Sequence, residues 1–246
     1  MRAFIFPGQG SQAVGMGKAL ADASPTARAV FQEVDEALGQ HLFRLMCDGP
    51  ESELTLTENA QPAIMANAIA TLRVLETEGG VRLSEKCNFV AGHSLGEYSA
   101  LAAAGALSIA DAARLLRIRG RAMQEAVPVG IGAMAALLGL DFATAQQVAE
   151  AAAQGDVCQA ANDNDPAQVV VSGHKAAVER AVDLAKAAGA KRAVMLPVSA
   201  PFHCALMEPA AKVMAQALDD VTINSPAVPL VANVRAVAVT DPTLIR

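Results

Sequence analysis

A serine between two glycines, placed where a buried strand turns into a helix, is the feature that most constrains this chain. Residues 89–91 are apolar and residues 95–105 are rich in good helix formers, so the motif Gly92-x-Ser94-x-Gly96 falls at the junction. Glycine at both positions permits a sharp bend and a close approach of helix and strand. The context favours a nucleophile elbow, with the serine at the positive end of a helix, over a flexible loop.

A nucleophilic serine requires donors for the oxyanion that forms when it attacks. The N–H of Leu95, at the head of the predicted helix, is in position to donate one hydrogen bond. A second donor usually comes from a loop after another strand, and the loop that follows the predicted strand 3–6 offers Gln9. The alternative for this loop is an ordinary strand-to-helix turn.

The base must come from elsewhere in the chain, because His93 neighbours the serine on a tight turn and points away from it. His203 follows a predicted strand and opens a helix expected over residues 205–218. That is the usual placement of the base downstream of such a serine. His41, in a polar turn, and His174, on a separate segment, are weaker candidates. We therefore predict His203 as the base, with a structural histidine as the alternative.

One arginine lies on the wrong face of its helix for a surface residue. Ser108 caps a predicted helix that runs to about residue 126, and Arg119 falls within its apolar face at about 100° per residue. The arginines on the opposite face, which we expect to be solvated, are Arg114, Arg117 and Arg121. A buried cation needs an anion or acceptors. Arg119 is thus predicted either to bind a ligand or to form an internal salt bridge or reach the edge of the face.

The central part of the chain changes pattern and predicts a second domain. Strands and helices are expected in the order β-α-β-β-α-β, over residues 133–138, 142–153, 157–161, 168–172, 176–188 and 192–196. This order is typical of a ferredoxin-like unit. We predict an insert at 130–197 within a larger α/β domain made of 1–129 and 198–246, with a cleft at the junction.

Composition excludes several classes of function. A net charge of −6 argues against general binding of nucleic acid, and 53% hydrophobic residues allow a sizeable core. No C-x-x-C pair occurs, so neither a zinc site nor a redox motif is indicated, and we expect reduced thiols in the cytoplasm. The cysteines are Cys47, Cys87, Cys158 and Cys204. No signal peptide or membrane span is visible in the sequence.

Four motifs together resemble a known family. They are Phe6-Pro7-Gly8-Gln9-Gly10-Ser11-Gln12, Gly92-His93-Ser94-Leu95-Gly96-Glu97, Arg119-Gly120-Arg121-Ala122-Met123 and Pro201-Phe202-His203. Their order and spacing are similar, over essentially the whole chain, to the malonyl-CoA:acyl carrier protein transacylases of fatty-acid synthesis. The resemblance implies an α/β-hydrolase-like large domain with a parallel sheet that carries the ferredoxin-like insert.

The resemblance also implies a role for each site residue. Ser94 would be the nucleophile, His203 its base, and Gln9 and Leu95 the oxyanion donors, while Arg119 would bind the malonyl carboxylate. The reaction would be a ping-pong acyl transfer. The serine takes malonyl from malonyl-CoA, and the phosphopantetheine thiol of an acyl carrier protein then takes it from the serine.

Further expectations concern selectivity and partners. Phe202 before the histidine, together with the leucine after the serine, resembles selectors of malonyl rather than methylmalonyl, although many bacterial members carry serine at that position. An acidic carrier protein would need a basic patch, for which Lys186, Lys191 and Arg192 are candidates; the alternative is a solvated helix end. We expect a monomer that binds coenzyme A thioesters and needs no permanent cofactor, metal, membrane or nucleic acid.

Family members usually continue for some tens of residues past the position of Arg246. We therefore expect part of the large domain to be missing from this sequence, including a segment whose backbone carbonyl orients the histidine. Two other functional classes stay open. One is a serine hydrolase that uses the same serine and histidine with water as acceptor, and the other is an inactive or scaffolding subunit. The buried arginine and the insert favour a transferase over a hydrolase.

Overall fold

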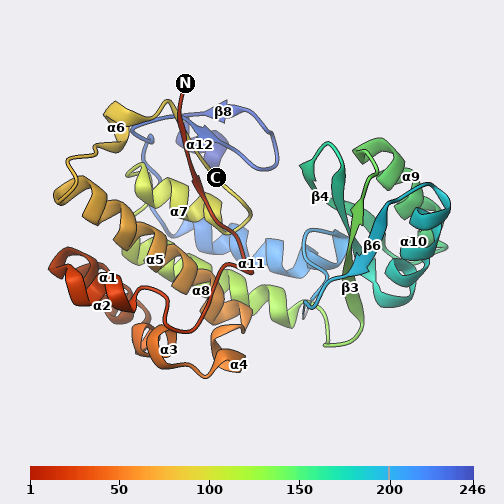
Figure 1. Cartoon of the computed structure of the whole chain (residues 1–246), viewed down its shortest axis with the longest axis horizontal. Helices are drawn as coiled ribbons and strands as arrows, with labels where there is room; N and C mark the ends of the chain where they lie inside the picture. The colour runs from red at the N-terminus through yellow and green to blue at the C-terminus, as the bar shows by residue number, and fades with distance from the viewer. Residues whose placement is uncertain (199) are drawn as a thin grey trace. The chain divides into compact units, whose positions relative to one another are not determined.

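The computed structural model describes residues 1–198 and 200–246 and divides into two compact units (Figure 1). The larger unit contains residues 1–121 and 214–246, and the smaller unit contains residues 122–213. The smaller unit includes the whole segment 130–197 that the sequence predicts as an insert, together with residues on both sides of it. Both boundaries fall inside helices, namely α8 (Ile109–Glu125) and α11 (Glu208–Asp219).

The larger unit contains a mostly parallel sheet. Its strands lie in the order β1 (Ala3–Phe6), β2 (Phe89–Gly92), β7 (Leu230–Val231) and β8 (Ala238–Val239). The first three strands are parallel, and β8 is antiparallel to β7. The prediction of a mixed α/β fold with a parallel sheet is confirmed. Parallel strands end at one edge of a sheet, so the loops that follow β1 and β2 are neighbours.

The helices of the larger unit begin and end at recognisable sequence signals. In α2 (Pro25–Leu38) the Oγ of Ser24 accepts the N–H of Ala27 at 3.3 Å, and Gly39, with φ of 59°, ends the helix. The other helices of this unit besides α8 and the end of α11 are α1 (Lys18–Ala23), α3 (Leu42–Asp48), α4 (Glu51–Leu54), α5 (Thr57–Thr77), α6 (Leu83–Lys86), α7 (Gly96–Ala103) and α12 (Pro242–Ile245).

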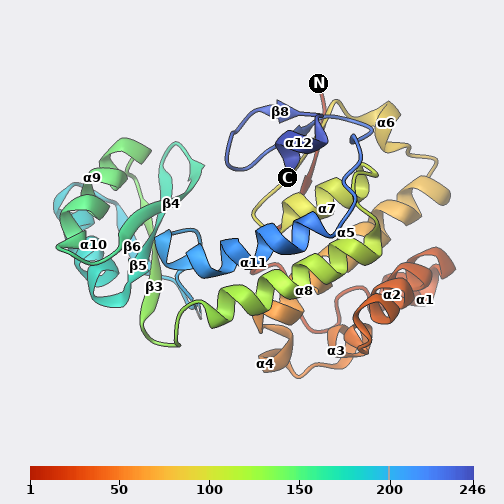
Figure 2. The same cartoon turned by 180° about the vertical axis from the view of Figure 1, so that it is seen from behind.

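Helix α5 is the central helix of the larger unit and is buried over most of its circumference. It packs against α2 and α7, and α7 in turn covers β1 and β2 (Figure 2). Ile64, Met65 and Ile69 of α5 are at most 2% exposed and share a core with Val90 and Leu230 of the sheet. Across the described ranges, no helix combines the length and apolarity that crossing a membrane requires.

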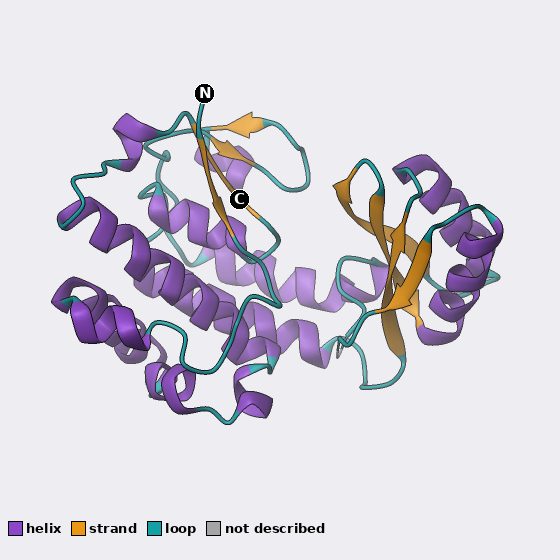
Figure 3. Ribbon diagram, viewed as in Figure 1, coloured by secondary structure: helices purple, strands orange, loops and turns teal. Residues whose placement is uncertain are grey.

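The smaller unit has the strands and helices that the sequence predicts, in the predicted order. Its antiparallel sheet has the strand order β4 (Cys158–Asp165), β5 (Gln168–His174), β3 (Gly132–Leu138) and β6 (Arg192–Met195). Helices α9 (Phe142–Ala153) and α10 (Lys175–Ala187) lie on one face of this sheet (Figure 3). A 3₁₀ turn, Ala205–Met207, leads into α11.

Both faces of strands β3 and β5 are buried, which explains the continuous apolar runs 133–138 and 169–171 within them. Side chains alternate between the two faces of a strand. Leu137 and Val169 pack with the alanine-rich faces of α9 and α10, whereas Met134 and Val170 pack with Phe202 on the other side. Small alanine side chains let the helices approach the sheet closely.

Candidate functional site

Ser94 lies on a strained turn between β2 and α7, as the sequence predicts. Its φ of 52° is in the left-handed region, which costs a non-glycine residue about 1–3 kcal/mol. The flanking glycines are required by space: a Cβ on Gly92 would collide with the backbone of Gly96, and a Cβ on Gly96 would collide with the carbonyl of Phe6. The turn therefore presents the serine where strand and helix cross.

The side chain of Asn233 holds this turn from the segment between β7 and β8. Its Oδ1 accepts the N–H of Ser94 at 3.0 Å, and its Nδ2 donates to the carbonyl of Gly92 at 2.7 Å. The same Nδ2 donates to Oε2 of Glu97, also at 2.7 Å. Burial raises the pKa of Glu97, and the bonds from Asn233 and the charge of Arg119 act in the opposite direction. One amide side chain thus connects the end of β2, the turn and the first residues of α7.

Leu95 is the residue whose N–H the sequence predicts as an oxyanion donor. It is 1% exposed and precedes the first turn of α7, where the helix dipole is positive. Within the described part of the chain, its N–H donates to no acceptor, whereas the N–H of Ser94 is bonded to Asn233. Of these two amides, that of Leu95 can donate to an oxyanion directly, whereas that of Ser94 would first have to break its bond to Asn233.

The loop after β1, which carries Gln9, lies directly against the elbow. A Cβ on Gly8 would be 2.6 Å from Nδ1 of His93, and the N–H of His93 donates to the carbonyl of Phe6 at 3.1 Å. Nε2 of Gln9 donates to Oγ1 of Thr57, at the start of α5, at 3.3 Å. The structure therefore brings the loop of Gln9 to the serine turn and connects its side chain to α5.

Arg119 points inward from α8, on the face that the helical periodicity predicts. Its Nη2 donates to Oγ of Ser94 at 3.0 Å, and its Nη1 donates to Oε1 of Gln61 at 2.8 Å. The guanidinium also lies over the ring of Tyr98, 5.8 Å from the centroid. Burial lowers the pKa of Arg119, while Tyr98 and Glu97 raise it. Arginine stays protonated even so, which places a cation beside the serine oxygen.

The expectation that Arg117 is solvated is wrong. Its side chain is 13% exposed, with Nη1 3.8 Å from Oε2 of Glu58, and burial lowers its pKa. The cause is the contact between α8 and α5. A Cβ on Gly120 would be 2.5 Å from Cα of Glu58 and 2.6 Å from the carbonyl of Thr57, so the helix backbones touch and cover the arginine. Arg114 and Arg121 are exposed, as predicted.

His203 and Phe202 belong to the smaller unit, on the segment before α11. His203 has a φ of 60°, another left-handed position at a residue that is not glycine. Phe202 is 7% exposed and packs with Met134 and Met207, so it is a core residue of this unit. The N–H of Ala205 donates to Oε1 of Gln159 at 2.7 Å and anchors the segment to β4.

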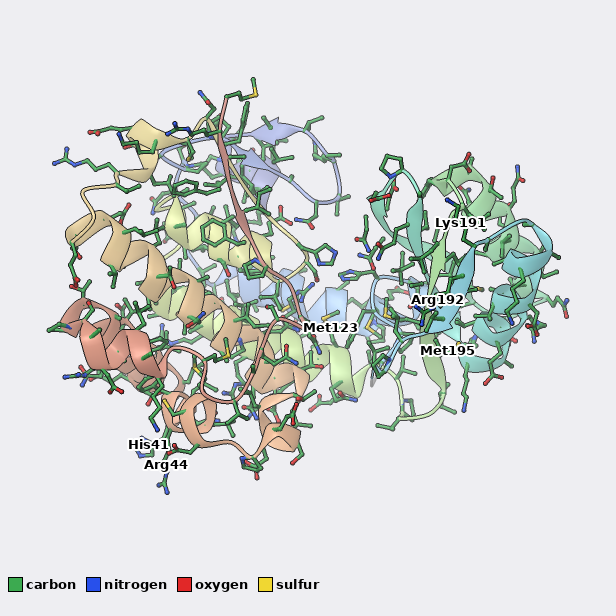
Figure 4. The ribbon with its side chains drawn as sticks, in the orientation of Figure 1. His41, Arg44, Met123, Lys191, Arg192 and Met195 are labelled. Carbon is green, nitrogen blue, oxygen red and sulfur yellow. The ribbon has the colours of Figure 1, made fainter. Side chains whose placement is uncertain are left out.

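The two other candidate histidines have ordinary surroundings. His41 is exposed beside Arg44 at the surface of α3 (Figure 4). Nδ1 of His174 accepts the N–H of Val157 at 2.9 Å and lies 3.7 Å from Oδ1 of Asp156. The first is a surface residue, and the second connects β5 to the start of β4.

The basic residues predicted for a partner are exposed. Lys191 and Arg192 lie at the start of β6 (Figure 4), and Lys186 lies in the last turn of α10, where its Nζ is 3.1 Å from Oδ1 of Asp183. Their charges are thus accessible, with that of Lys186 partly offset by its neighbour.

Three residues of the site were not predicted: Gln61, Thr57 and Asn233. Gln61 is fully buried in a helix that is otherwise apolar at this point, and that is a signal which the sequence contains. Thr57 begins the same helix and is 1% exposed. Asn233 has no comparable signal, because it lies in a polar turn 139 residues from the serine that it binds.

Comparison with known proteins adds independent findings. A family model described as "Acyl transferase domain" matches residues 3–245. The chain is 50% identical, over 99% of its length and 78% of the relative, to a protein of Escherichia coli (strain K12) named "Malonyl CoA-acyl carrier protein transacylase".

Solved structures agree with this match. A structure described as acyl-carrier-protein-S-malonyltransferase from Bartonella henselae has a TM-score of 0.96 and 56% identity, covering 100% of this chain and 78% of that one. A malonyl-transacylase in complex with its type II PKS acyl-carrier protein has a TM-score of 0.94 and 46% identity. That alignment covers 99% of this chain and 77% of the other.

Proposed function

This chain belongs to the acyl transferase domain family, and we propose that it transfers a malonyl group from malonyl-CoA to an acyl carrier protein in fatty-acid synthesis. Ser94 carries the malonyl group between the two substrates as an ester. Malonyl-CoA and the phosphopantetheine of the carrier protein are substrates, and no permanent cofactor is part of the proposal.

The observation that carries this proposal is the hydrogen bond from Arg119 to the oxygen of Ser94. A cation 3.0 Å from a serine oxygen on a strained elbow suits an acyl group that ends in a carboxylate. A hydrolase of uncharged esters has no use for a buried cation there. The names of the relatives favour the transferase over the hydrolase in the same way.

In the first half-reaction, Oγ of Ser94 attacks the thioester carbonyl of malonyl-CoA while His203 takes the serine proton. The carbonyl oxygen becomes an oxyanion, which accepts hydrogen bonds from the N–H of Leu95 and from a second N–H, that of Gln9. When the intermediate collapses, the carbon–sulfur bond breaks. The CoA sulfur leaves with the proton from His203, and Ser94 keeps the malonyl ester.

The second half-reaction repeats these steps with a different thiol. The phosphopantetheine thiol gives its proton to His203 and attacks the ester carbonyl, and the serine oxygen leaves and takes the proton back. Throughout both halves, Arg119 binds the malonyl carboxylate through two parallel hydrogen bonds. Phe202 limits the space available to a branched acyl group.

The finer description of the fold is also part of the proposal. A parallel sheet with a serine elbow supports an α/β-hydrolase-like large domain, and the strand order β4-β5-β3-β6 with helices on one face supports a ferredoxin-like insert. The exposed Lys191 and Arg192, with Lys186, would receive the acidic carrier protein. The protein would act in the cytoplasm as a monomer.

The test follows the malonyl group by intact mass. The protein is mixed with malonyl-CoA alone, and then with holo-carrier protein, with apo-carrier protein as the control that lacks the thiol. We expect one malonyl group on the protein, lost on addition of the holo-carrier, which gains it. Release of free malonate without carrier loading would identify a hydrolase. Absence of any adduct would identify a scaffolding protein.

A further inference from the structure

The hydrogen bonds of Asn233 point to a role in the chemistry that its place in a distant turn does not suggest. We infer that Asn233 is a positioning residue that locks the serine turn in its reactive geometry, working as a pair with Glu97. The inference rests on the proposed function of Ser94 as nucleophile.

Ser94 needs support from outside its own turn. Ser94 has a φ of 52°, a conformation that persists only when the surroundings impose it. Two backbone bonds close the elbow, one from the N–H of Gly96 to the carbonyl of His93 at 2.9 Å and one from the N–H of Glu97 to the carbonyl of Ser94 at 3.1 Å. Asn233 supplies three bonds to three consecutive parts of the elbow: the carbonyl of Gly92 before the turn, the N–H of Ser94 within it, and the carboxylate of Glu97 after it.

The bond from Ser94 to Asn233 decides which amide faces the substrate. By accepting the N–H of Ser94, the Oδ1 of Asn233 directs that amide away from the reaction. The N–H of Leu95 then stays available for the oxyanion. Asn233 therefore selects the donor as well as the position of the serine oxygen.

Glu97 sets the orientation of the Asn233 amide. Its Oε2 accepts from Nδ2 of Asn233 at 2.7 Å, and its Oε1 accepts the backbone N–H of the same residue at 3.4 Å. The carboxylate thus fixes the amide with its nitrogen toward Glu97 and its oxygen toward the serine, because the reverse orientation would place two oxygens together. Replacing the donor on residue 233 and the acceptor on residue 97 provides the test.

Asn233→Asp keeps the shape of the side chain and the acceptor for Ser94 but removes both donors. Its new oxygen faces the carboxylate of Glu97, and two facing carboxylates take up a shared proton at low pH. That proton restores the bond to Glu97, and its loss as pH rises produces repulsion instead. The other charged groups nearby are Arg119, which faces Glu97, and Arg235 and Arg246, which line the adjoining cavity. Tyr98 also faces Glu97, and burial raises the pKa of its hydroxyl. Arginines stay charged over this range, so among these groups the carboxylate pair is the one that titrates.

We expect kcat of Asn233→Asp to fall about 10²-fold at pH 8, the scale of a misplaced reacting group, with KM for malonyl-CoA little changed. Its kcat relative to the unaltered protein should decrease as pH rises from 6 to 8.5. Taking this ratio cancels the titration of the base that both proteins share. In the double variant Asn233→Asp/Glu97→Gln the ratio should not change with pH, and kcat should be about tenfold higher than in Asn233→Asp.

Asn88→Ala is the matched control. Asn88 lies just before the start of β2, and its Oδ1 accepts the N–H of Arg2 at 3.0 Å. The variant therefore removes an asparagine hydrogen bond far from the serine and should leave kcat unchanged. If Asn233→Asp does not fold, the double variant has only one carboxylate and still carries the test. A wild-type kcat in either variant, or a lowered melting temperature with an unaltered pH ratio, would overturn the inference.

A fluorophosphonate probe separates this inference from the proposed function. The probe reads the reactivity of Ser94 whatever the acyl donor. Failure of the unaltered protein to accept malonyl, combined with normal labelling by the probe, would reject the proposed function and leave the positioning role of Asn233 testable. Equal labelling rates in the unaltered protein and in Asn233→Asp would reject the positioning role of Asn233 alone.

Discussion

Ser94 and His203 both have a left-handed backbone, with φ values of 52° and 60°, but different interactions hold them there. The serine turn is held by polar bonds, three of which come from Asn233. The histidine segment follows Pro201 and Phe202, both buried. Phe202 packs in an apolar cluster, and the N–H of Ala205 bonds the segment to Gln159.

The difference indicates how each part of the site would fail. Hydrogen bonds are directional, so an isosteric change of polarity at the elbow should impair the chemistry while leaving the packing almost intact. Apolar packing depends on the volume of the side chains, so a change of volume near the histidine should lower stability before it affects the chemistry.

The largest effect should come from Ser94→Ala. Removal of the nucleophile should lower malonyl transfer by about 10⁴-fold or more and abolish the malonyl adduct, because no ester can form. Intact mass after mixing with malonyl-CoA measures the adduct. A stable adduct in this variant would show that another residue is the nucleophile.

His203→Ala should slow acylation by about 10²–10⁴-fold, the usual contribution of a general base. Rapid mixing with malonyl-CoA, followed by acid quench and mass measurement, gives the rate. His174→Ala, in the same unit, is the matched control and should acylate at the normal rate. An unchanged rate in His203→Ala would make that histidine structural.

Arg119→Ala should lower kcat/KM for malonyl-CoA by about 10²–10³-fold, since loss of one partner of a buried ion pair costs about 3–5 kcal/mol. The acetyl group has no carboxylate to pair with Arg119, so transfer from acetyl-CoA should persist or increase. Arg121→Ala and Arg114→Ala, both exposed, are the controls. Equal losses for both substrates would show that Arg119 supports the fold rather than the selectivity.

Phe202→Leu should lower the free energy of unfolding by about 1.5 kcal/mol or less, because the side chain fills a packed cluster. Phe142→Leu, at a residue that is 40% exposed, should change stability very little. Thermal and urea unfolding measure both. If Phe202→Leu unfolds like the control, the histidine segment does not depend on packing, and the contrast with the elbow fails.

The smallest effect concerns the carrier protein. Reversing both charges with Lys191→Glu and Arg192→Glu should raise KM for the carrier several-fold and leave KM for malonyl-CoA unchanged, most clearly at low salt. Lys175→Glu, at an exposed residue at the other end of α10, is the control. An unaltered carrier KM at low salt would reject the patch.

Local patterns made much of this molecule predictable. The apolar strands β3 and β5, and helices with one apolar face, determine the smaller unit, and the spacing of Gly92, Ser94 and Gly96 determines the elbow. Both signals lie within a few residues of the feature that they predict. The short helices α1, α3 and α6 were not predicted, since four to seven residues carry too little periodicity.

Long-range contacts explain what the sequence did not predict. Asn233 becomes part of the site only because β7 lies beside β2, a neighbourhood that no local pattern encodes. Arg117 falls on the outer face of an isolated helix and is covered only because another helix packs over it. Residues of this kind require the tertiary structure.

The glycine that brings those two helices together has a consequence for engineering. Gly120 neighbours Arg119, and its missing side chain lets α8 touch the backbone of Thr57 and Glu58. Gln61, which orients the arginine, is one turn farther along the same helix α5. Acyl preference in this protein would then be a property of the spacing between two helices as much as of one cation. Redesign toward uncharged acyl groups would have to adjust that spacing together with the arginine.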